Sequence, residues 1–390
     1  MGYHYLALIN CVLIFFLSLK IYGRDLFSPV SLNCLSWGIV FLIGIFIGHG
    51  YHEIPQDIFF SWVFWFYITN VIFFLMKPDE KLNSDLNEIK TFSYWPIVIL
   101  ITAFTLYRVY VVGTSGNFGF ILNLRMANVD KSGEFSDIGG ILFFSLPFLF
   151  LLGYEILSGK NKLNIASLSL YQVAFILATS AKFAVINAIF IAIVCVNRKK
   201  RLSMISFFKY FSLLLIAMLI LHITRMASND DRSIIDLLGI YIYSPIVAVQ
   251  YLEPSKEFGE YTFRFLYAVL NKAEIIDLVP VDTILEYKYV PYGTNVFTVF
   301  QPFYQDFSYI GIVIFSIIYG LIFGLFYRKY RQGKALYIIA YSFFCVSLAT
   351  QFLSETLITN FSQNVKFLLF GYIIIRIMNF GKSTNSPRNI

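Results

Sequence analysis

Long apolar runs separated by short polar connections form the main pattern of this chain. A run of about 20 apolar residues crosses the hydrocarbon core of a bilayer as one helix. With this length as the criterion, eleven spans are expected, at residues 4–21, 30–48, 58–76, 94–113, 139–157, 165–180, 183–197, 205–223, 308–327, 336–353 and 365–380. The pattern therefore predicts an all-α polytopic membrane protein, with residues 1–390 forming a single integral membrane domain.

The stretch from 165 to 197 is apolar over more residues than one helix needs. Thr179, Ser180 and Lys182 interrupt it near the middle. A lysine at the centre of a membrane helix costs about 2.5–3.5 kcal/mol on insertion scales. We therefore expect two short helices that meet at a hydrated turn.

The distribution of Lys and Arg over the connections predicts the orientation. Alternate connections carry most of the basic residues, namely Arg24, Lys77, Lys81, Lys90, Lys160, Lys162, Arg198, Lys199, Lys200, Arg201, Arg328, Lys329, Arg331, Lys334, Lys382 and Arg388. Excess positive charge marks the cytoplasmic side of a membrane protein. The connections at 48–57, 114–138 and 224–307 are then outside, and an odd number of spans puts the amino terminus outside and the carboxyl terminus inside.

The longest connection, residues 224–307, is expected to form a periplasmic loop with interfacial helices. Its most apolar part, residues 234–252, is nearly long enough to span but is interrupted by Asp236, Gly239 and Pro245. We expect this part to lie at or dip into the membrane interface. The expected anchors are Tyr241, Tyr243 and Tyr251. A twelfth span is the alternative, and it would move Arg264 to the cytoplasmic side.

Composition excludes several classes of protein. With 58% hydrophobic residues, 14% charged residues and a mean hydropathy of +0.70, a soluble domain would need an implausibly large core. The net charge of +7 comes from Lys and Arg in short loops, so no nucleic-acid partner is expected. The four cysteines all lie in apolar runs without a CxxC motif, which supports neither a disulfide framework nor a zinc site. Residues 5–19 follow no basic residue and precede no cleavage site, so we interpret them as a retained first helix.

Two arginines stand just beyond apolar spans on the predicted outer side, Arg125 and Arg225. Lys182, Arg232 and Arg264 add positive charge to that side. The planar guanidinium binds phosphate oxygens through two parallel hydrogen bonds and stays charged at every relevant pH. The arrangement therefore predicts a site for a membrane-borne phosphate or diphosphate. The alternative is that each arginine caps a helix or extends to the interface.

A base is required if the phosphate group leaves in the reaction. His222 lies three residues before Arg225 on the same helical face, and Asp230 and Asp231 follow shortly after. A solvated histidine at the end of a span is the alternative interpretation of His222.

No metal or cofactor is expected. His49 and His52 have the spacing of a ligand pair, but a glycine separates them and no third ligand is evident. The adjacent Asp230 and Asp231 do not form an Asp-x-Asp metal motif. P-loop, GxGxxG, GxSxG and HExxH motifs are all absent from the sequence, which disfavours nucleotide-driven transport and the common hydrolase reactions.

The segment 291–324 combines polar and aromatic side chains just before a predicted span. Its hydrogen-bonding residues are Asn295, Gln301, Tyr304 and Asp306. Such a composition suits the faces and hydroxyl groups of sugars. Its glycines, Gly311, Gly320 and Gly324, would let the following helix pack closely.

At this point the sequence resembles the O-antigen polymerase (Wzy) family, which polymerises oligosaccharide repeat units of bacterial surface polysaccharides. The resemblance lies in the Asn-Val-Phe-Thr run from Asn295 through Pro302-Phe303-Tyr304 to Asp306-Phe307, in the turn at 179–182, and in the two arginine-bearing outer loops. Two departures are visible. Ser308 stands where glycine is expected, and neither arginine is followed by glycine eleven residues later.

The resemblance implies a GT-C-like, inverting membrane glycosyltransferase in the bacterial inner membrane with its active site facing the periplasm. It implies that a growing glycan on undecaprenyl diphosphate is transferred to a new lipid-linked repeat unit. The expected catalytic residues are Arg225, His222, Asp230 and Asp306. The expected substrate-binding residues are Arg125, Lys182, Arg232, Arg264, Asn295 and Tyr304. Membrane lipid, a chain-length regulator and a flippase are the implied partners.

Two other classes stay open. An O-antigen ligase or an O-acyltransferase is the nearer alternative, and the ligase shares the lipid donor. A lipid-linked oligosaccharide flippase would also be polytopic, although its loops should be short and its charges should line a cavity within the spans.

Overall fold

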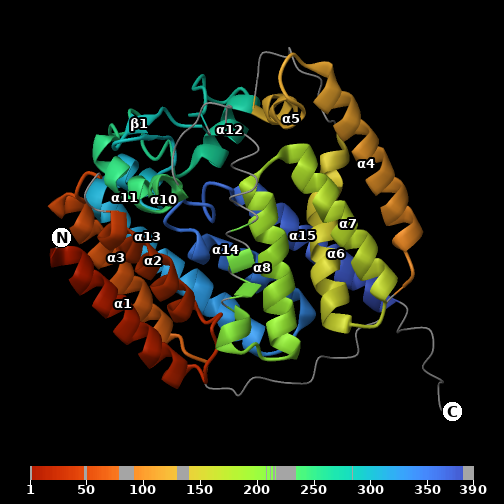
Figure 1. The fold of residues 1–390 in the computed structure, drawn as a ribbon, viewed down its shortest axis with the longest axis horizontal. Helices are drawn as coiled ribbons and strands as arrows, with labels where there is room; N and C mark the ends of the chain where they lie inside the picture. Colours follow the sequence, from red (N-terminus) through yellow and green to blue (C-terminus); the bar gives the residue numbers. More distant parts are fainter. Residues whose placement is uncertain are drawn as a thin grey trace. The chain divides into compact units, whose positions relative to one another are not determined.

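A computed structural model describes residues 2–47, 51–78, 92–129, 140–207, 209–210, 212–213, 216, 234–282 and 284–380 (Figure 1). The chain divides into two compact units, each assembled from separate stretches. Unit 1 contains residues 1–81, 231–328 and 344–364, and unit 2 contains residues 82–230, 329–343 and 365–390.

Unit 1 begins with three long helices, α1 (Gly2–Ile21), α2 (Pro29–Ile47) and α3 (Gln56–Leu75), and α2 packs against both of the others (Figure 1). One face of α1 is buried through Ala7, Cys11, Phe15 and Ser18. The opposite face exposes large apolar side chains, among them Leu6, Ile9, Leu13 and Phe16. A continuous exposed apolar face of this kind suits contact with lipid.

Aromatic side chains fill the space between α2 and α3. Trp37, Phe41, Trp65 and Phe66 are completely buried. Trp62 meets Phe41 edge to face, with 4.6 Å between ring centroids. These contacts fix the pairing of the two helices, because aromatic rings bury much area and prefer this geometry.

The segment expected at the interface forms four consecutive helical pieces in unit 1. They are α10 (Ile234–Leu238), the π-helical turn η2 (Gly239–Tyr243), α11 (Ser244–Ala248) and η3 (Val249–Tyr251). Residues 244–249 are all buried, so this segment does not lie with one face free at the surface of the unit. The anchoring role expected for Tyr243 is wrong, because its ring is 2% exposed and its hydroxyl lies 3.0 Å from His4 Nε2. Tyr251, in contrast, is 43% exposed.

The rest of the long connection holds a short helix and a small hairpin. The helix is α12 (Arg264–Lys272), and the hairpin pairs β1 (Lys288–Tyr289) with β2 (Gly293–Thr294) in antiparallel register. Three helices follow along the chain, α13 (Gln301–Arg331), α14 (Ala335–Ala349) and α15 (Phe361–Phe380).

Close packing of α13 at its glycines is confirmed. A Cβ atom at Gly320 would lie 2.8 Å from side-chain atoms of Ile72, and one at Gly324 would lie 2.6 Å from the sulfur of Met76. Both contacts are with the end of α3, so α13 can approach α3 only because these positions carry no side chain.

Unit 2 contains α4 (Trp95–Ser115), α5 (Phe120–Val129), η1 (Gly140–Phe144), α6 (Ser145–Ser158), α7 (Lys162–Thr179) and α8 (Lys182–Lys199). Helix α7 packs against α4 and α6, and α6 also packs against α8. Gly159 ends α6 in the left-handed region with φ 65°, and the Asn161 side chain caps α7 by accepting from the Asn164 amide.

The break expected between 165 and 197 is confirmed, since α7 ends at Thr179 and α8 begins at Lys182. Among the described residues, seven helices are long and apolar enough to cross a membrane, namely α1, α2, α3, α4, α7, α13 and α15. Shorter apolar helices cover 142–158, 235–251 and 335–349. The expected number of eleven spans stays a prediction, because 205–223 lies largely outside the described residues. The single-domain organisation and the GT-C-like architecture also stay predictions.

Candidate functional site

In unit 2, the short helix α5 is attached to the carboxyl end of α7. Leu124 of α5 and Ala178 of α7 are completely buried and belong to one apolar cluster with Val109 and Val112 of α4. The Asn128 amide donates to the Ala178 carbonyl at 3.0 Å. This hydrogen bond and the cluster fix α5 beside the turn that follows α7.

The turn between α7 and α8 leaves the amino end of α8 without a side-chain cap. Ser180 adopts the left-handed region with φ 48° and ends α7. Ala181 occupies the capping position of α8, and its methyl group offers no acceptor. An uncapped helix amino end carries partial positive charge and attracts anions.

Two predicted cationic residues lie on the elements that border this turn. Arg125 lies three residues before Asn128 on α5, and Lys182 is the first residue of α8, four residues after Ala178. Both side chains are half-buried. A lysine at the first position of a helix adds its charge to the positive helix end, which is unfavourable unless an anion lies nearby.

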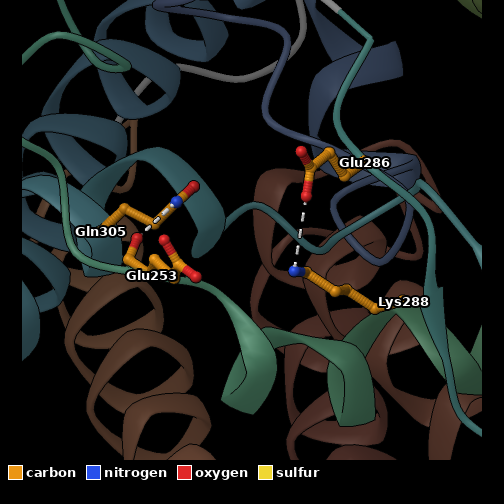
Figure 2. Close-up of polar contacts among 4 residues, drawn as sticks. All are labelled: Glu253, Glu286, Lys288 and Gln305. Carbon is orange, nitrogen blue, oxygen red and sulfur yellow. Dashed lines mark hydrogen bonds and ion pairs between the residues drawn. The ribbon is translucent and has the colours of Figure 1, made fainter.

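In unit 1, the start of α13 holds the segment 253–262 in place. Gln305 Nε2 donates to the Glu253 carbonyl at 2.7 Å (Figure 2), and the Ser255 amide donates to the Gln305 carbonyl at 3.0 Å. The two oxygens of Asp306 accept from the Thr262 amide at 2.7 Å and the Tyr261 amide at 3.4 Å. The predicted catalytic carboxylate Asp306 therefore holds a backbone segment in this structure.

Carboxylates surround the phenol of Tyr261. Burial, together with the charges of Glu260, Asp306 and Glu253, raises the pKa of Tyr261 and outweighs the opposite effect of its hydrogen bond with Gln305. The phenol therefore stays protonated at neutral pH and can donate a hydrogen bond.

Ser308, two residues after Asp306, breaks α13 into two helices. Its φ of 53° and ψ of −141° lie in a region that glycine adopts readily and other residues rarely do. The glycine that the resemblance led us to expect at position 308 would adopt these backbone angles readily. The rings of Phe303 and Phe315 stack across the break with 4.2 Å between centroids.

The other predicted substrate-binding residues of unit 1 have separate environments. Arg264 Nε donates to the Val281 carbonyl at 2.6 Å. The Tyr304 hydroxyl lies 3.4 Å from Asp57 Oδ2, and Asn295 is half-buried in the segment between β2 and α13. These contacts orient the side chains but identify no ligand.

A weak ion pair lies close to β1. Lys288 Nζ is 3.8 Å from Glu286 Oε2, and the Glu286 side chain is 91% exposed (Figure 2). Exposed ion pairs contribute little to stability. This pair is therefore unimportant for the site.

Four predicted site residues, His222, Arg225, Asp230 and Arg232, lie outside the described residues, as does His49. In the described part of the chain, no group of three or more His, Cys, Asp or Glu side chains is arranged to hold a metal ion.

The sequence interpretation missed a buried polar network in unit 1. Gln351, completely buried, accepts from Trp65 Nε1 at 2.9 Å and donates to Asn33 Oδ1 at 2.6 Å. Asn33 in turn donates to Thr69 at 3.0 Å. Buried polar residues within apolar helices are often functional, so the polar residues of 350–355 at the end of a predicted span were the available signal.

Glu355 is the second missed residue. Its carboxylate accepts from the amides of Leu357, Ile358 and Thr359 at 2.7–2.8 Å and from the Tyr319 hydroxyl. Trp65 and Tyr319 lie midway along α3 and α13, so the non-helical segment 350–360 reaches the central depth of long apolar helices. At that depth such backbone is tolerated only where protein buries it or where it lines a hydrated cavity.

Taken together, the helices and their exposed apolar faces define a polytopic membrane protein. The chain is similar to an O-antigen polymerase of Shigella dysenteriae, with 24% identity over 263 residues. The similar region covers 64% of this chain and 65% of the relative, slightly less than two thirds of its length. No protein-family model and no solved structure matches the chain.

Proposed function

We propose that this protein is a membrane glycosyltransferase that joins lipid-linked oligosaccharide repeat units into a surface polysaccharide. The similarity to an O-antigen polymerase supports this reaction class. The donor is the growing glycan on undecaprenyl diphosphate, and the acceptor is a single lipid-linked repeat unit. The reaction takes place at the outer face of the bacterial inner membrane. Arg125 and Lys182 are predicted to lie on this side.

The observation that carries the proposal is the attachment of α5 to the α7–α8 turn. It places Arg125 and Lys182 at one end of unit 2, together with the uncapped amino end of α8. A diphosphate offers several anionic oxygens to such a group. The guanidinium can bind two of them at once, while the lysine and the backbone amides of α8 bind others.

The proposed reaction is a displacement at the anomeric carbon of the donor. A hydroxyl oxygen of the acceptor forms the new bond, its proton passes to a base, and undecaprenyl diphosphate leaves with the bonding electrons. His222 and Asp230 are the candidates for the base. Because the cations stabilise charge that builds on the diphosphate, no second carboxylic acid is required, and the anomeric configuration inverts.

Asp306 has a positioning role within unit 1 in this proposal. Both of its oxygens accept backbone amides of the 253–262 segment, so its role in this proposal is to hold that segment. Asn295 and Tyr304 are the candidates for binding sugar hydroxyls, and Arg225 and Arg232 are further candidates for binding the diphosphate.

Substitution of the two cations tests the proposal. Arg125→Ala and Lys182→Ala, each expressed in a strain that lacks the native gene, should shift the product from long chains to single repeat units. Arg125→Lys separates charge from geometry, because lysine keeps the charge but cannot form two parallel hydrogen bonds. The control is Lys160→Ala, which removes an exposed lysine from the α6–α7 connection.

The chain-length distribution on a gel is the measurement, with membrane levels checked by immunoblot. Normal chain lengths at normal protein levels in both alanine variants would exclude this diphosphate site. A deletion strain distinguishes the reaction classes: loss of a polymerase leaves one repeat unit on the acceptor lipid, whereas loss of a ligase leaves none. Loss of a flippase traps the units inside the cell.

A further inference from the structure

The polar face of α12 forms hydrogen bonds with neighbouring segments of unit 1. Arg264 Nε donates to the Val281 carbonyl at 2.6 Å, and the Tyr267 hydroxyl donates to the Phe258 carbonyl at 2.8 Å. The Asn271 amide donates to the Ile276 carbonyl at 3.4 Å. Positions 264, 267 and 271 follow helical spacing, so one face of α12 carries all three contacts.

The opposite face of α12 is apolar and partly exposed. It consists of Phe265, Leu266, Val269 and Leu270. Leu266 is 51% exposed and Val269 is 46% exposed. A short amphipathic helix on a water-exposed surface turns its apolar face inward, so α12 has the reverse of the arrangement expected in water.

The connection that follows α12 is open in the same way. Ile275 is 68% exposed and Val279 is 88% exposed. Exposed apolar side chains scattered singly are ordinary, but a helix face and its adjoining connection form a larger patch, which indicates contact with a partner.

Two membrane-crossing helices indicate which partner this is. The Phe265 ring lies 5.5 Å from the ring of Phe361, the first residue of α15. The Phe263 ring lies 6.2 Å from the ring of Phe307, next to the break in α13. Both α13 and α15 are long and apolar enough to cross a membrane, so the ends that α12 contacts lie near the boundary of the bilayer.

The charges of α12 also fit this boundary. Arg264 and Lys272 begin and end the helix, and Tyr267 lies on its polar face. Basic and tyrosine side chains accumulate at the level of the lipid head groups, where their charged or hydroxyl ends stay hydrated. A helix with such ends and an open apolar face is typical of an interfacial helix.

We propose that α12 lies at the outer surface of the membrane that the protein crosses. There it inserts Leu266 and Val269 among the lipid acyl chains. The partner is the bilayer lipid. α12 then supplies the interfacial contact that was expected from residues 234–252, whose central part, 244–249, is buried in unit 1. This assignment does not depend on the enzymatic activity of the protein.

Site-specific fluorescence tests the assignment in the full-length protein. Leu266→Cys and Val269→Cys are labelled with the dye NBD, and the protein is placed in vesicles of phosphatidylethanolamine and phosphatidylglycerol. All four native cysteines are buried, so the wild-type protein gives the labelling background. Lys272→Cys, at the exposed end of the helix, is the control.

The labels at 266 and 269 should emit at a shorter wavelength than the control label at 272. Lipids with a nitroxide on the upper acyl chain should quench them at least threefold more than they quench the control. Iodide in the water should quench the control more strongly. Equal iodide quenching at 269 and 272 would place the face in water. A short-wavelength label at 269 that neither quencher reaches would show that protein covers the face. Either result would overturn the proposal.

Discussion

Two buried carboxylates, one in each unit, are held by different kinds of hydrogen-bond donor. Glu355 of unit 1 accepts three backbone amides from residues 357–359 and the hydroxyl of Tyr319. Among the described residues, Glu155 of unit 2 accepts from side chains, namely the hydroxyls of Tyr94 and Ser158 and the amide of Asn164. Both are at most 6% exposed.

The difference decides what each residue does for its surroundings. A hydroxyl can rotate and accept a hydrogen bond, whereas a backbone N–H can only donate. The amides around Glu355 therefore require acceptors on both carboxylate oxygens. Glu355 fixes the path of a non-helical segment, while Glu155 joins the ends of α4, α6 and α7 through donors that tolerate rearrangement.

The largest effect is expected for Glu355→Gln. The new amide nitrogen would face at least one backbone N–H, which then has no acceptor. Because this N–H is buried and loses a charged partner, the substitution should lower stability by about 3 kcal/mol. Thermal unfolding of the purified protein in detergent measures the loss. An unchanged melting temperature would mean that the carboxylate does not hold the 357–359 amides.

Asn164→Ala should have the next largest effect. The Asn164 side chain accepts from the amides of Tyr94 and Trp95 and donates to the Phe92 carbonyl and to Glu155. Loss of a helix cap and of these hydrogen bonds, one of which goes to a carboxylate, should cost about 2 kcal/mol. The same melting measurement applies, and Asn161→Ala, which removes only the cap of α7, should cost less.

Tyr319→Phe is expected to cost about 1 kcal/mol, because it removes one donor and leaves three amides on the Glu355 carboxylate. Comparison with Glu355→Gln separates the contribution of the phenol from that of the backbone amides. Equal losses in the two variants would contradict the view that the backbone donors dominate.

The smallest effect is expected for Glu155→Gln, below about 1 kcal/mol. The glutamine oxygen can accept from Tyr94 and Asn164, and the Ser158 hydroxyl can turn to accept from the new amide nitrogen. A loss as large as that of Glu355→Gln would abolish the distinction between the two carboxylates.

The sequence predicted most helices of both units correctly. Their positions follow from apolar runs of membrane-spanning length, and the break at 179–182 follows from the cost of a charged residue within such a run. The close contacts of Gly320 and Gly324 were also predictable, because only small residues permit them.

The site residues predicted from the sequence stay predictions, and nothing in the sequence indicated which of them lie close in space. Arg125 and Lys182 are 57 positions apart in the sequence, and their common location depends on the packing of α5 against α7, which hydropathy does not report. The burial of Tyr243 and the role of Glu355 were missed for a related reason. Each has a partner more than 30 residues away, namely His4 for Tyr243 and Tyr319 for Glu355.

The amino-acid sequence alone determined that this chain is a polytopic membrane protein and where most of its long apolar helices lie, because transfer of an apolar run into hydrocarbon depends mainly on local composition. The tertiary structure decided which polar groups are buried together and which apolar face of the long connection stays open. Those outcomes depend on hydrogen bonds and contacts between distant segments, such as Gln351 with Trp65 and Phe265 with Phe361. Composition along the chain carries no information about such pairs.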